Sequence, residues 1–408
     1  MKPIDHGEPI DQIAENPWRQ KRMSDVPTAA PQDQTLAGAR DWLQRHLEAG
    51  LHPLSFIDRQ AAERAIARLS GIDPVAWSET WLAEAELFAA AAAASEQAGR
   101  RFAARESWHQ AYRFAFMGRY PVPNHPAKEV AYTKAREYFL RAAVLDDPPV
   151  QRVVVPFAGR TGEGETVAFY VARPNGVARP PVVMIWAGID SWKEDVLFLC
   201  RRYWQRGIAT ILIDMPGTGE SPVLAGTDAE RQWDPVFEWI DASELDESRV
   251  AALGGSFGGY WAHKLAHTHR DRLVAAVNWA GGVHLTFQRS WQERSRNASS
   301  YLMDLMAARA RIFGGSTFED YVARCPELSL LDQGWMDEPS CPLLLVNGKD
   351  DLQNTSKDIT LALEHGDPKT ARLYPGGHMG ADMQTVQGSI AQWLHPYLLG
   401  PATQGTRS

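Results

Sequence analysis

One serine in this chain lies among closely spaced glycines at the end of an apolar run. Residues 254–258 read Gly-Gly-Ser-Phe-Gly, and a helical pattern follows them. A serine on a sharp strand-to-helix turn is presented to a substrate, and its flanking residues must be small because larger side chains would collide with the neighbouring strand or helix. The spacing predicts a nucleophile elbow, with Ser256 as the attacking group and the Phe257 amide as a donor to a developing oxyanion. Glycine-rich turns without a catalytic role share this pattern, so the surrounding sequence must decide.

Two later loops carry the groups that an attacking serine needs. Residues 348–351 read Gly-Lys-Asp-Asp, and residues 376–380 read Gly-Gly-His-Met-Gly. An imidazole takes the proton from the serine, and a carboxylate orients that imidazole and stabilises its charged form. We therefore predict a triad of Ser256, His378 and an aspartate. Asp351 is preferred to Asp350, because the acid loop of such folds usually places its aspartate three residues after a glycine.

A second oxyanion donor is expected from residues 186–191, which read Trp-Ala-Gly-Ile-Asp-Ser. The candidates are the backbone amides of Gly188 and Ile189. Further along this segment, Ser191 and Glu194 match the Ser-x-x-Glu pattern of a capping box, so we interpret those side chains as helix-starting rather than catalytic.

These motifs lie at the ends of short apolar runs that alternate with amphipathic stretches, a pattern typical of a mostly parallel sheet covered by helices. The predicted strands are residues 152–157, 167–172, 181–187, 209–214, 249–253, 273–279, 342–347 and 372–374. The elbow follows the fifth strand, and the acid and histidine follow the seventh and eighth. This order predicts an α/β-hydrolase fold with an eight-stranded sheet.

The rest of the chain divides into four further parts. Residues 1–35 are rich in Pro, Asp and Gln and predict an arm, and residues 401–408 predict a loose tail. Residues 36–147 predict a helical domain, in which Asp73 caps a helix that Pro74 begins. The run Asp-Asp-Pro-Pro ends that domain, and the catalytic domain spans residues 148–400. Within it, residues 285–339 are too long for a bare loop and predict a helical insertion, with helical spacing over 301–306.

With these motifs, the chain resembles the family of 2,6-dihydroxypseudooxynicotine hydrolase and the fermentation-respiration switch protein. The resemblance is carried by the elbow, by Gly-Ile-Asp-Ser-Trp-Lys-Glu-Asp at 188–195, by Asp-Met-Pro-Gly-Thr-Gly-Glu-Ser at 214–221 and by the helical segment 98–115. It covers about residues 73 to 395. It implies a homodimer with a helical cap over the active site, and hydrolysis of a carbon-carbon bond beside a ketone in several members.

In one respect this chain differs from the nicotine-pathway member, where a glutamate between nucleophile and acid is implied to assist. Here the loop after the sixth predicted strand reads Trp-Ala-Gly-Gly-Val-His and has no carboxylate. His284, the last of these residues, is a candidate for a supporting role, although a single loop histidine is more often structural. We predict hydrolysis of a carbon-carbon bond next to a ketone in an aromatic or polyketide-like compound. The alternatives are a carboxylesterase or thioesterase, and a non-catalytic binding protein on the same scaffold.

The chain holds fifteen tryptophans. Trp186, Trp192 and Trp279 lie on or near the segments expected around the serine, and with His284 they are candidates for an aromatic substrate pocket. Core packing is the alternative for each ring.

Charge and composition exclude several other classes of function. The net charge of −8 and the lack of a basic stripe argue against nucleic-acid binding. The Asp214 to Ser221 turn lacks the P-loop lysine and the full Gly-x-Gly-x-x-Gly spacing, so no nucleotide cofactor is expected. His263, His267 and His269 have no carboxylate or thiol at ligand spacing, so we interpret them as solvent-facing histidines at a helix end and expect no metal.

Three scattered cysteines predict no disulfide framework. Free thiols fit a reducing compartment, and the first eight residues lack the apolar core of a signal peptide. No apolar run is long enough to span a membrane. We expect a cytoplasmic enzyme whose partner is a small carbonyl compound.

Overall fold

The computed structural model describes residues 35–296 and 301–400 of the 408-residue chain. The predicted arm, apart from its last residue, and the predicted tail lie outside the described residues.

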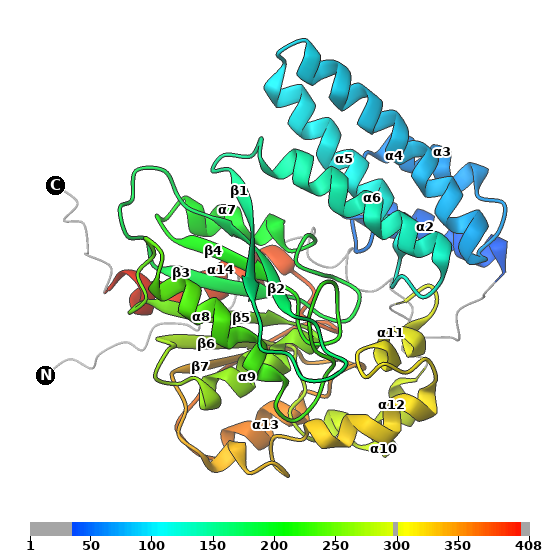
Figure 1. Ribbon diagram of the computed structural model, residues 1–408. Coiled ribbons are helices and arrows are strands. Elements are labelled where there is room, and N and C mark those ends of the chain that lie inside the picture. The colour runs from blue at the N-terminus through cyan, green and yellow to red at the C-terminus, as the bar shows by residue number, and fades with distance from the viewer. Residues whose placement is uncertain (1–34, 297–300, 401–408) are drawn as a thin grey trace, which may run out of the picture.

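An eight-stranded sheet forms the centre of the catalytic domain (Figure 1). Its strands are β1 (Val150–Pro156), β2 (Thr166–Ala172), β3 (Val182–Trp186), β4 (Ala209–Ile213), β5 (Val250–Gly255), β6 (Ala275–Trp279), β7 (Leu343–Gly348) and β8 (Thr370–Tyr374). They lie in the order β1-β2-β4-β3-β5-β6-β7-β8, in which β1 and β2 are antiparallel to their neighbours and the other pairs are parallel. The predicted eight-stranded sheet is confirmed, with strand ends displaced by a few residues.

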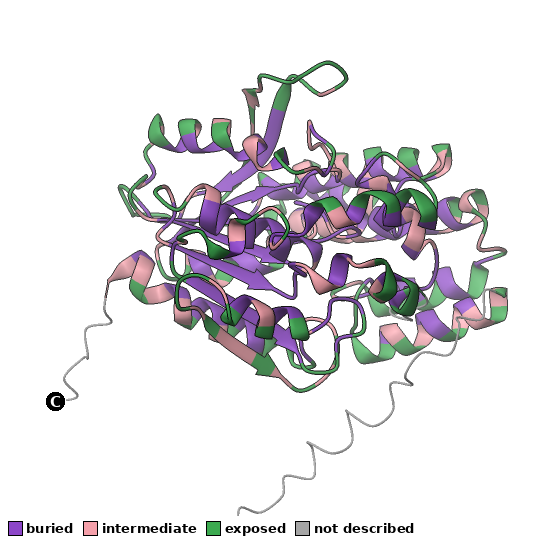
Figure 2. Ribbon diagram, turned by 90° about the horizontal axis from the view of Figure 1, so that it is seen from below, coloured by how far each residue is buried: buried purple, intermediate pink, exposed green. Residues whose placement is uncertain are grey.

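Helices cover both faces of this sheet, as buried parallel strands require. They are α7 (Leu197–Trp204), α8 (Asp234–Asp241), α9 (Phe257–Thr268), α13 (Lys357–Leu363) and α14 (Met383–Leu399). In Figure 1, α8 and α9 lie in front of the sheet, while α7 and α14 lie behind it. Strands β3 to β7 are buried along nearly their whole length (Figure 2). The carboxyl ends of the parallel strands are therefore held by a rigid core.

Among the residues that the structure describes, five helices precede the sheet and form the N-terminal helical region. They are α2 (Leu36–Ala49), α3 (Arg59–Arg68), α4 (Pro74–Gln97), α5 (Arg101–Arg119) and α6 (Pro126–Ala143). Asp73 caps α4 through the amides of the first turn, and Pro74 begins the helix, as its fixed φ angle favours. Trp77 and Trp81 are fully buried in this region, and the indole of Trp77 donates to the Met117 carbonyl at 2.6 Å. The helices lie beside the sheet rather than on either face (Figure 1).

The segment between β6 and β7 is a helical insertion that includes α10 (Arg289–Ser295), α11 (Leu305–Arg311) and α12 (Phe318–Arg324). The predicted helical spacing over 301–306 is wrong for residues 301–304, because α11 begins only at Leu305. Asp304 has a left-handed φ of 56° and bonds the Lys128 ammonium of α6 at 3.0 Å, and Tyr301 stacks on Tyr120. Contacts with the N-terminal helical region thus prevail over the local helical pattern.

Candidate active site

Ser256 lies at the turn between β5 and α9 with φ 54° and ψ −131°, a strained conformation for a residue with a side chain. The residues two positions before and two positions after it must be glycines, because the turn is packed against other backbone. A Cβ atom on Gly254 would lie 2.0 Å from the Gly258 carbonyl oxygen, and one on Gly258 would lie 2.2 Å from the Ala187 carbonyl oxygen. The spacing of the motif is therefore explained by main-chain contacts on both sides of the serine.

The structure brings Ser256, His378 and Asp351 together from three loops. The Ser256 hydroxyl lies 2.8 Å from His378 Nε2, and His378 Nδ1 lies 2.7 Å from Asp351 Oδ2. The carboxyl side chain of Asp351 is fully buried, and the imidazole is 17% exposed. Asp350 is exposed and contributes its amide to the Gly376 carbonyl instead. Among the two aspartates of this loop, the geometry favours Asp351 as the acid.

Asp351 is held by more than the histidine. Its Oδ1 accepts from the amides of Gln353 at 2.7 Å and Asn354 at 3.2 Å, and its Oδ2 accepts from Asn347 Nδ2 at 2.9 Å. Burial raises the pKa of the carboxyl, but the facing His378 and these hydrogen bonds outweigh burial, so the pKa lies below its ordinary value. The Asp351 carboxylate therefore stays ionised to a lower pH than an ordinary aspartate.

Sequence reasoning missed Asn347, the residue that joins the acid loop to the histidine loop. Its side-chain oxygen accepts from the Gly348 amide at 2.8 Å and from the Met379 amide at 3.2 Å, while its NH₂ group donates to Asp351. An asparagine in a buried strand, four residues before the acid, was the only signal available.

The loop predicted to complete an oxyanion hole passes directly against the elbow. A Cβ atom on Gly188 would lie 2.9 Å from the Ser256 hydroxyl and 3.3 Å from the Phe257 nitrogen. Phe257 begins α9, and the amides of a helix's first turn take no part in its own hydrogen-bond ladder. Ile189 follows in the same loop and is buried. The Gly188 backbone therefore lies beside the Ser256 hydroxyl and the Phe257 amide, and Ile189 is the next residue of the same loop.

The prediction of a capping box at Ser191 and Glu194 is wrong. Helix α7 begins later, and its N-cap residue Val196 makes no side-chain cap. Glu194 instead turns inward, where it accepts from the Tyr170 hydroxyl at 2.8 Å and lies 3.2 Å from the Lys193 ammonium. The Glu194 side chain points inward because the buried ammonium of Lys193 needs a partner of opposite charge.

Lys193 forms the centre of a buried ionic cluster that sequence reasoning also missed. Its ammonium is fully buried and lies 2.6 Å from Asp214, which follows β4, and 2.9 Å from Glu220. Asp214 also accepts from the Lys193 amide at 2.9 Å and from the Glu220 amide at 2.8 Å. Burial alone lowers the pKa of Lys193, but Asp214 and Glu194 raise it well above its ordinary value, so the lysine is charged. The cluster joins the loop after β3 to the loop after β4.

The three tryptophans predicted to line a pocket are almost fully buried, each about 1% exposed. The indole of Trp186 donates to the Gly258 carbonyl at 2.7 Å, and that of Trp279 donates to the Met379 carbonyl at 2.9 Å. Trp192 packs on the guanidinium of Arg119. From within the core, Trp186 supports the elbow, Trp279 supports the histidine loop and Trp192 supports the loop after β3. Their burial fits core packing, the alternative that the sequence left open for each ring.

His284, the fourth predicted pocket residue, bonds the Ser329 hydroxyl through Nδ1 at 2.7 Å. The main chain around His284 is held by Asp358, whose carboxylate accepts the amides of residues 283 to 286. The Asp358 carboxylate is thus already occupied by four main-chain donors.

The prediction that the helix-end histidines face solvent is wrong for two of them. His263 and His267 are buried on α9 and their rings stack with centroids 5.5 Å apart, because the helix is covered on both sides at this point. His269 at the end of α9 is partly exposed and bonds Asp234 at 2.9 Å. In the part of the chain that the structure describes, no three His, Cys, Asp or Glu side chains are grouped as metal ligands.

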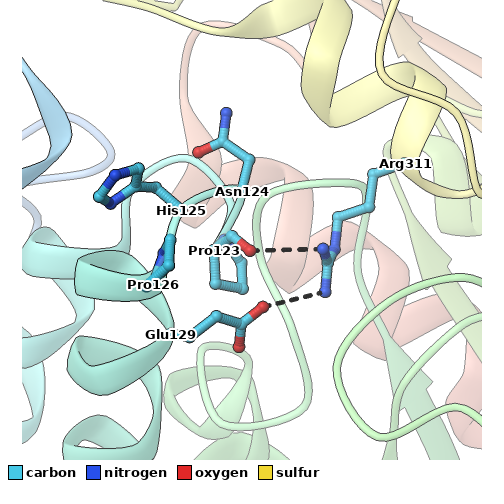
Figure 3. Close-up of a pocket in the computed structure, with 6 residues that line it drawn as sticks. All are labelled: Pro123, Asn124, His125, Pro126, Glu129 and Arg311. Carbon is cyan, nitrogen blue, oxygen red and sulfur yellow. Dashed lines mark hydrogen bonds and ion pairs between the residues drawn. The ribbon is translucent and has the colours of Figure 1, made fainter.

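A cavity of about 530 Å³ lies between the start of α6 and the end of α11 (Figure 3). It is lined by Pro123, Asn124, His125, Pro126, Glu129 and Arg311. Arg311 crosses it to the Pro123 carbonyl at 3.3 Å and to Glu129 at 3.7 Å. None of these residues belongs to the triad, so the cavity marks the contact between the insertion and the N-terminal helical region.

The sheet order and the elbow after β5 define the protein as an α/β-hydrolase. The crystal structure of 2,6-dihydroxy-pseudo-oxynicotine hydrolase superposes with a TM-score of 0.68 and 20% identity, over 88% of this chain and 96% of that one. The sequence matches the family model of the FrsA-like esterases over residues 60–374, and the chain therefore belongs to that family. Its predicted family is confirmed.

Curated relatives include fungal and bacterial hydrolases. Alpha/beta hydrolase pydG of Acremonium sp is 29% identical over 231 residues, which are 52% of this chain and 53% of the relative. The 2,6-dihydropseudooxynicotine hydrolase of Paenarthrobacter nicotinovorans is 31% identical over 157 residues, 37% of this chain and 40% of the relative. The chain thus spans about half or less of the length of these relatives.

Each of the helices in residues 35–296 and 301–400 is too short or too polar to cross a bilayer.

Proposed function

We propose that this α/β-hydrolase cleaves its substrate through a covalent acyl-enzyme formed on Ser256. The observation that carries the proposal is the chain of short contacts from the Ser256 hydroxyl through His378 to the buried, ionised Asp351. Such an arrangement supplies a nucleophile, a base and a group that orients the base.

In the first half of the reaction, Ser256 Oγ bonds to the substrate carbonyl carbon as His378 Nε2 takes the hydroxyl proton. The carbonyl oxygen becomes an oxyanion, to which the Phe257 amide and an amide of Gly188 or Ile189 donate. When the carbonyl re-forms, the bond to the leaving group breaks and His378 returns the proton to that group. In the second half, a water replaces the leaving group, and His378 again acts as base and then acid. The products are a carboxylic acid and the protonated leaving group.

For the bond that breaks, we propose a carbon-carbon bond next to a ketone in an aromatic or polyketide-like compound. Its support is the relationship to 2,6-dihydropseudooxynicotine hydrolase and the family resemblance. A ketone on the leaving fragment delocalises the negative charge of the carbanion as an enolate, so the carbon-carbon bond can break. The proton that His378 returns ends on the carbon of that fragment. The second candidate is an ester or thioester bond, which is favoured by the description of the matched family as esterases.

The test begins with intact-mass spectrometry after treatment with a fluorophosphonate probe. Wild type should gain one probe mass and Ser256→Ala should gain none. Ser221→Ala is the matched control, because Ser221 lies in another glycine-rich turn and bonds the Val223 carbonyl. This variant should label like wild type. If folded wild type does not label, the acyl-enzyme proposal is wrong and the non-catalytic binding protein replaces it.

Paired substrates then decide the bond. Aryl 1,3-diketones and aryl esters with the same acyl group are compared by kcat/KM. A higher value for the diketone supports carbon-carbon hydrolysis. A higher value for the ester replaces it by the esterase candidate while leaving the triad in place.

A further inference from the structure

The loop that holds the proposed oxyanion donors is bound by an arginine from outside the catalytic domain. Arg119 is the last residue of α5, in the N-terminal helical region, and its side chain is 2% exposed. One guanidinium nitrogen donates to the Asp190 carbonyl at 2.9 Å and to the Pro121 carbonyl at 2.9 Å. Another lies 2.6 Å from the Asp195 carboxylate. The guanidinium therefore fastens both ends of the segment that follows Ile189.

The flat faces of this guanidinium are also covered. It lies 4.1 Å from the ring centre of Trp192, within the same loop, and 4.6 Å from that of Phe116 on α5. The Asp195 carboxylate accepts from the Trp192 amide at 2.6 Å and from the Tyr112 hydroxyl of α5. Such contacts fix the position of the guanidinium, because a planar group of donors held between two rings has one arrangement that satisfies all of its hydrogen bonds.

Asp190 is held from a second side as well. Its carboxylate is buried and bonds His52 Nε2 at 2.9 Å, and it also hydrogen-bonds Tyr301. His52 belongs to the segment between α2 and α3, and Tyr301 belongs to the insertion. The residue next to Ile189 thus meets both helical additions to the sheet.

The distance from this attachment to the proposed chemistry is short. Asp190 is two residues from Gly188, which touches Ser256 so closely that a Cβ atom would lie 2.9 Å from the hydroxyl. One peptide unit separates the Asp190 carbonyl that Arg119 holds from the Ile189 amide, and two separate it from the Gly188 amide, the two amides proposed to face the oxyanion. A shift of that carbonyl therefore rotates or displaces these amides, and a misplacement of about 1 Å can cost a hundredfold in rate.

We infer that Arg119 is a positioning residue that sets the oxyanion loop, so that the N-terminal helical region determines the geometry of transition-state stabilisation. The inference rests on the proposed function. It assigns the helical region a role in kcat, beyond any role in covering the substrate. The Arg119 guanidinium acts through the Asp190 carbonyl and the Asp195 carboxylate, and it touches no reacting atom.

The experiment measures kcat and KM of Arg119→Ala and Arg119→Lys on the substrate that wild type prefers. Loss of the guanidinium should lower kcat about ten- to a hundredfold with little change in KM, because the affected interaction forms only in the transition state. Arg119→Lys should also lose kcat, since one ammonium cannot reach the Asp190 carbonyl and the Asp195 carboxylate in the same geometry. Guanidinium ion, at concentrations far below those that unfold proteins, should restore part of the kcat of Arg119→Ala, whereas sodium chloride and urea should not.

Arg40→Ala is the matched control. Arg40 lies on α2 of the same helical region and donates to the Ala67 carbonyl at 3.1 Å and to the Leu69 carbonyl at 2.7 Å, so its loss loosens the contact between α2 and α3, and none of these residues belongs to the oxyanion loop. It should keep its kcat even where its melting temperature falls.

Three results would overturn the inference: an Arg119→Lys variant with wild-type kcat, a rise in KM alone, or an equal loss of kcat in Arg40→Ala. If Arg119→Ala does not fold, Arg119→Lys with its melting curve gives the same decision. Failure of the proposed function is distinct, because wild type itself would then neither label with the fluorophosphonate nor turn over the substrates.

Discussion

The elbow and the loop after β3 both lie against the Ser256 hydroxyl, but different kinds of interaction hold them in place. Around Ser256, glycines let main chain pack on main chain, as where Gly258 meets the Ala187 carbonyl. Around Gly188, buried charges hold the backbone, with Lys193 on one side and Arg119 on the other. The first region is sensitive to any added volume. The second is sensitive to the loss of any one charge, since its partners would then be buried unpaired.

The largest expected effect lies at Asp351, the carboxylate that orients the proposed base His378. Asp351→Asn should lower kcat about 10⁴-fold, because the amide cannot stabilise the charged histidine and favours the wrong tautomer. Asp350→Asn is the matched control, since Asp350 is exposed one position earlier. It should stay within a factor of about two. Steady-state kinetics on the preferred substrate check both, and equal losses in the two variants would contradict the assignment of the acid.

A large loss of stability is expected on the charged side of the comparison. Lys193→Met removes the ammonium from among Asp214, Glu194 and Glu220 and should lower the free energy of unfolding by about 3–5 kcal/mol. The control is Glu244→Ala, which removes the exposed ion pair with Arg173 and should change that free energy by less than about 1 kcal/mol. Urea unfolding measures both. A Met variant as stable as wild type would show that the cluster is not what holds the loop.

The volume-sensitive side is tested by one methyl group. Gly258→Ala places a Cβ 2.2 Å from the Ala187 carbonyl oxygen and should cost about 1–3 kcal/mol, together with most of the activity. Gly226→Ala is the control, because nothing lies within 4 Å of its added Cβ and its φ is not positive. Thermal unfolding and kinetics compare the two. Full activity in Gly258→Ala would mean that the elbow tolerates added volume after all.

The smallest effect concerns neutral groups buried behind the elbow. Burial lowers the pKa of His263 well below its ordinary value, and burial also lowers that of His267. As the pH falls below about 6.5, these two histidines bind protons in the unfolded chain but stay neutral in the native protein. The free energy of unfolding should then decrease by up to about 1.4 kcal/mol per pH unit for each histidine.

His263→Asn sharpens this prediction, because it removes the titrating ring while keeping an acceptor for the Asn278 amide. Urea unfolding between pH 8 and 5 should show a shallower loss in the variant than in wild type. Parallel pH profiles would exclude His263 as a source of acid sensitivity.

Much of the fold and the triad could be predicted because their signals are local. Strands of this sheet are continuous apolar runs, and the elbow needs glycines within two residues of Ser256. The histidine and aspartate loops follow recognisable strands, so the order of the fold places them at one edge. The capping box failed because a local pattern at Ser191 gave no information on the demand of the buried Lys193 beside it.

The sequence by itself therefore determined the strands, the elbow, the family and the order of the three candidate triad residues along the chain. Only the tertiary structure decided which side chains hold the oxyanion loop, since Arg119 and Asp190 are 71 residues apart and neither belongs to a local motif that pairs them. It also decided that His263 and His267 are buried. The physical reason is the same in both cases: hydrogen bonds and desolvation depend on which segments pack together, and the periodicity of one segment carries no record of its partner.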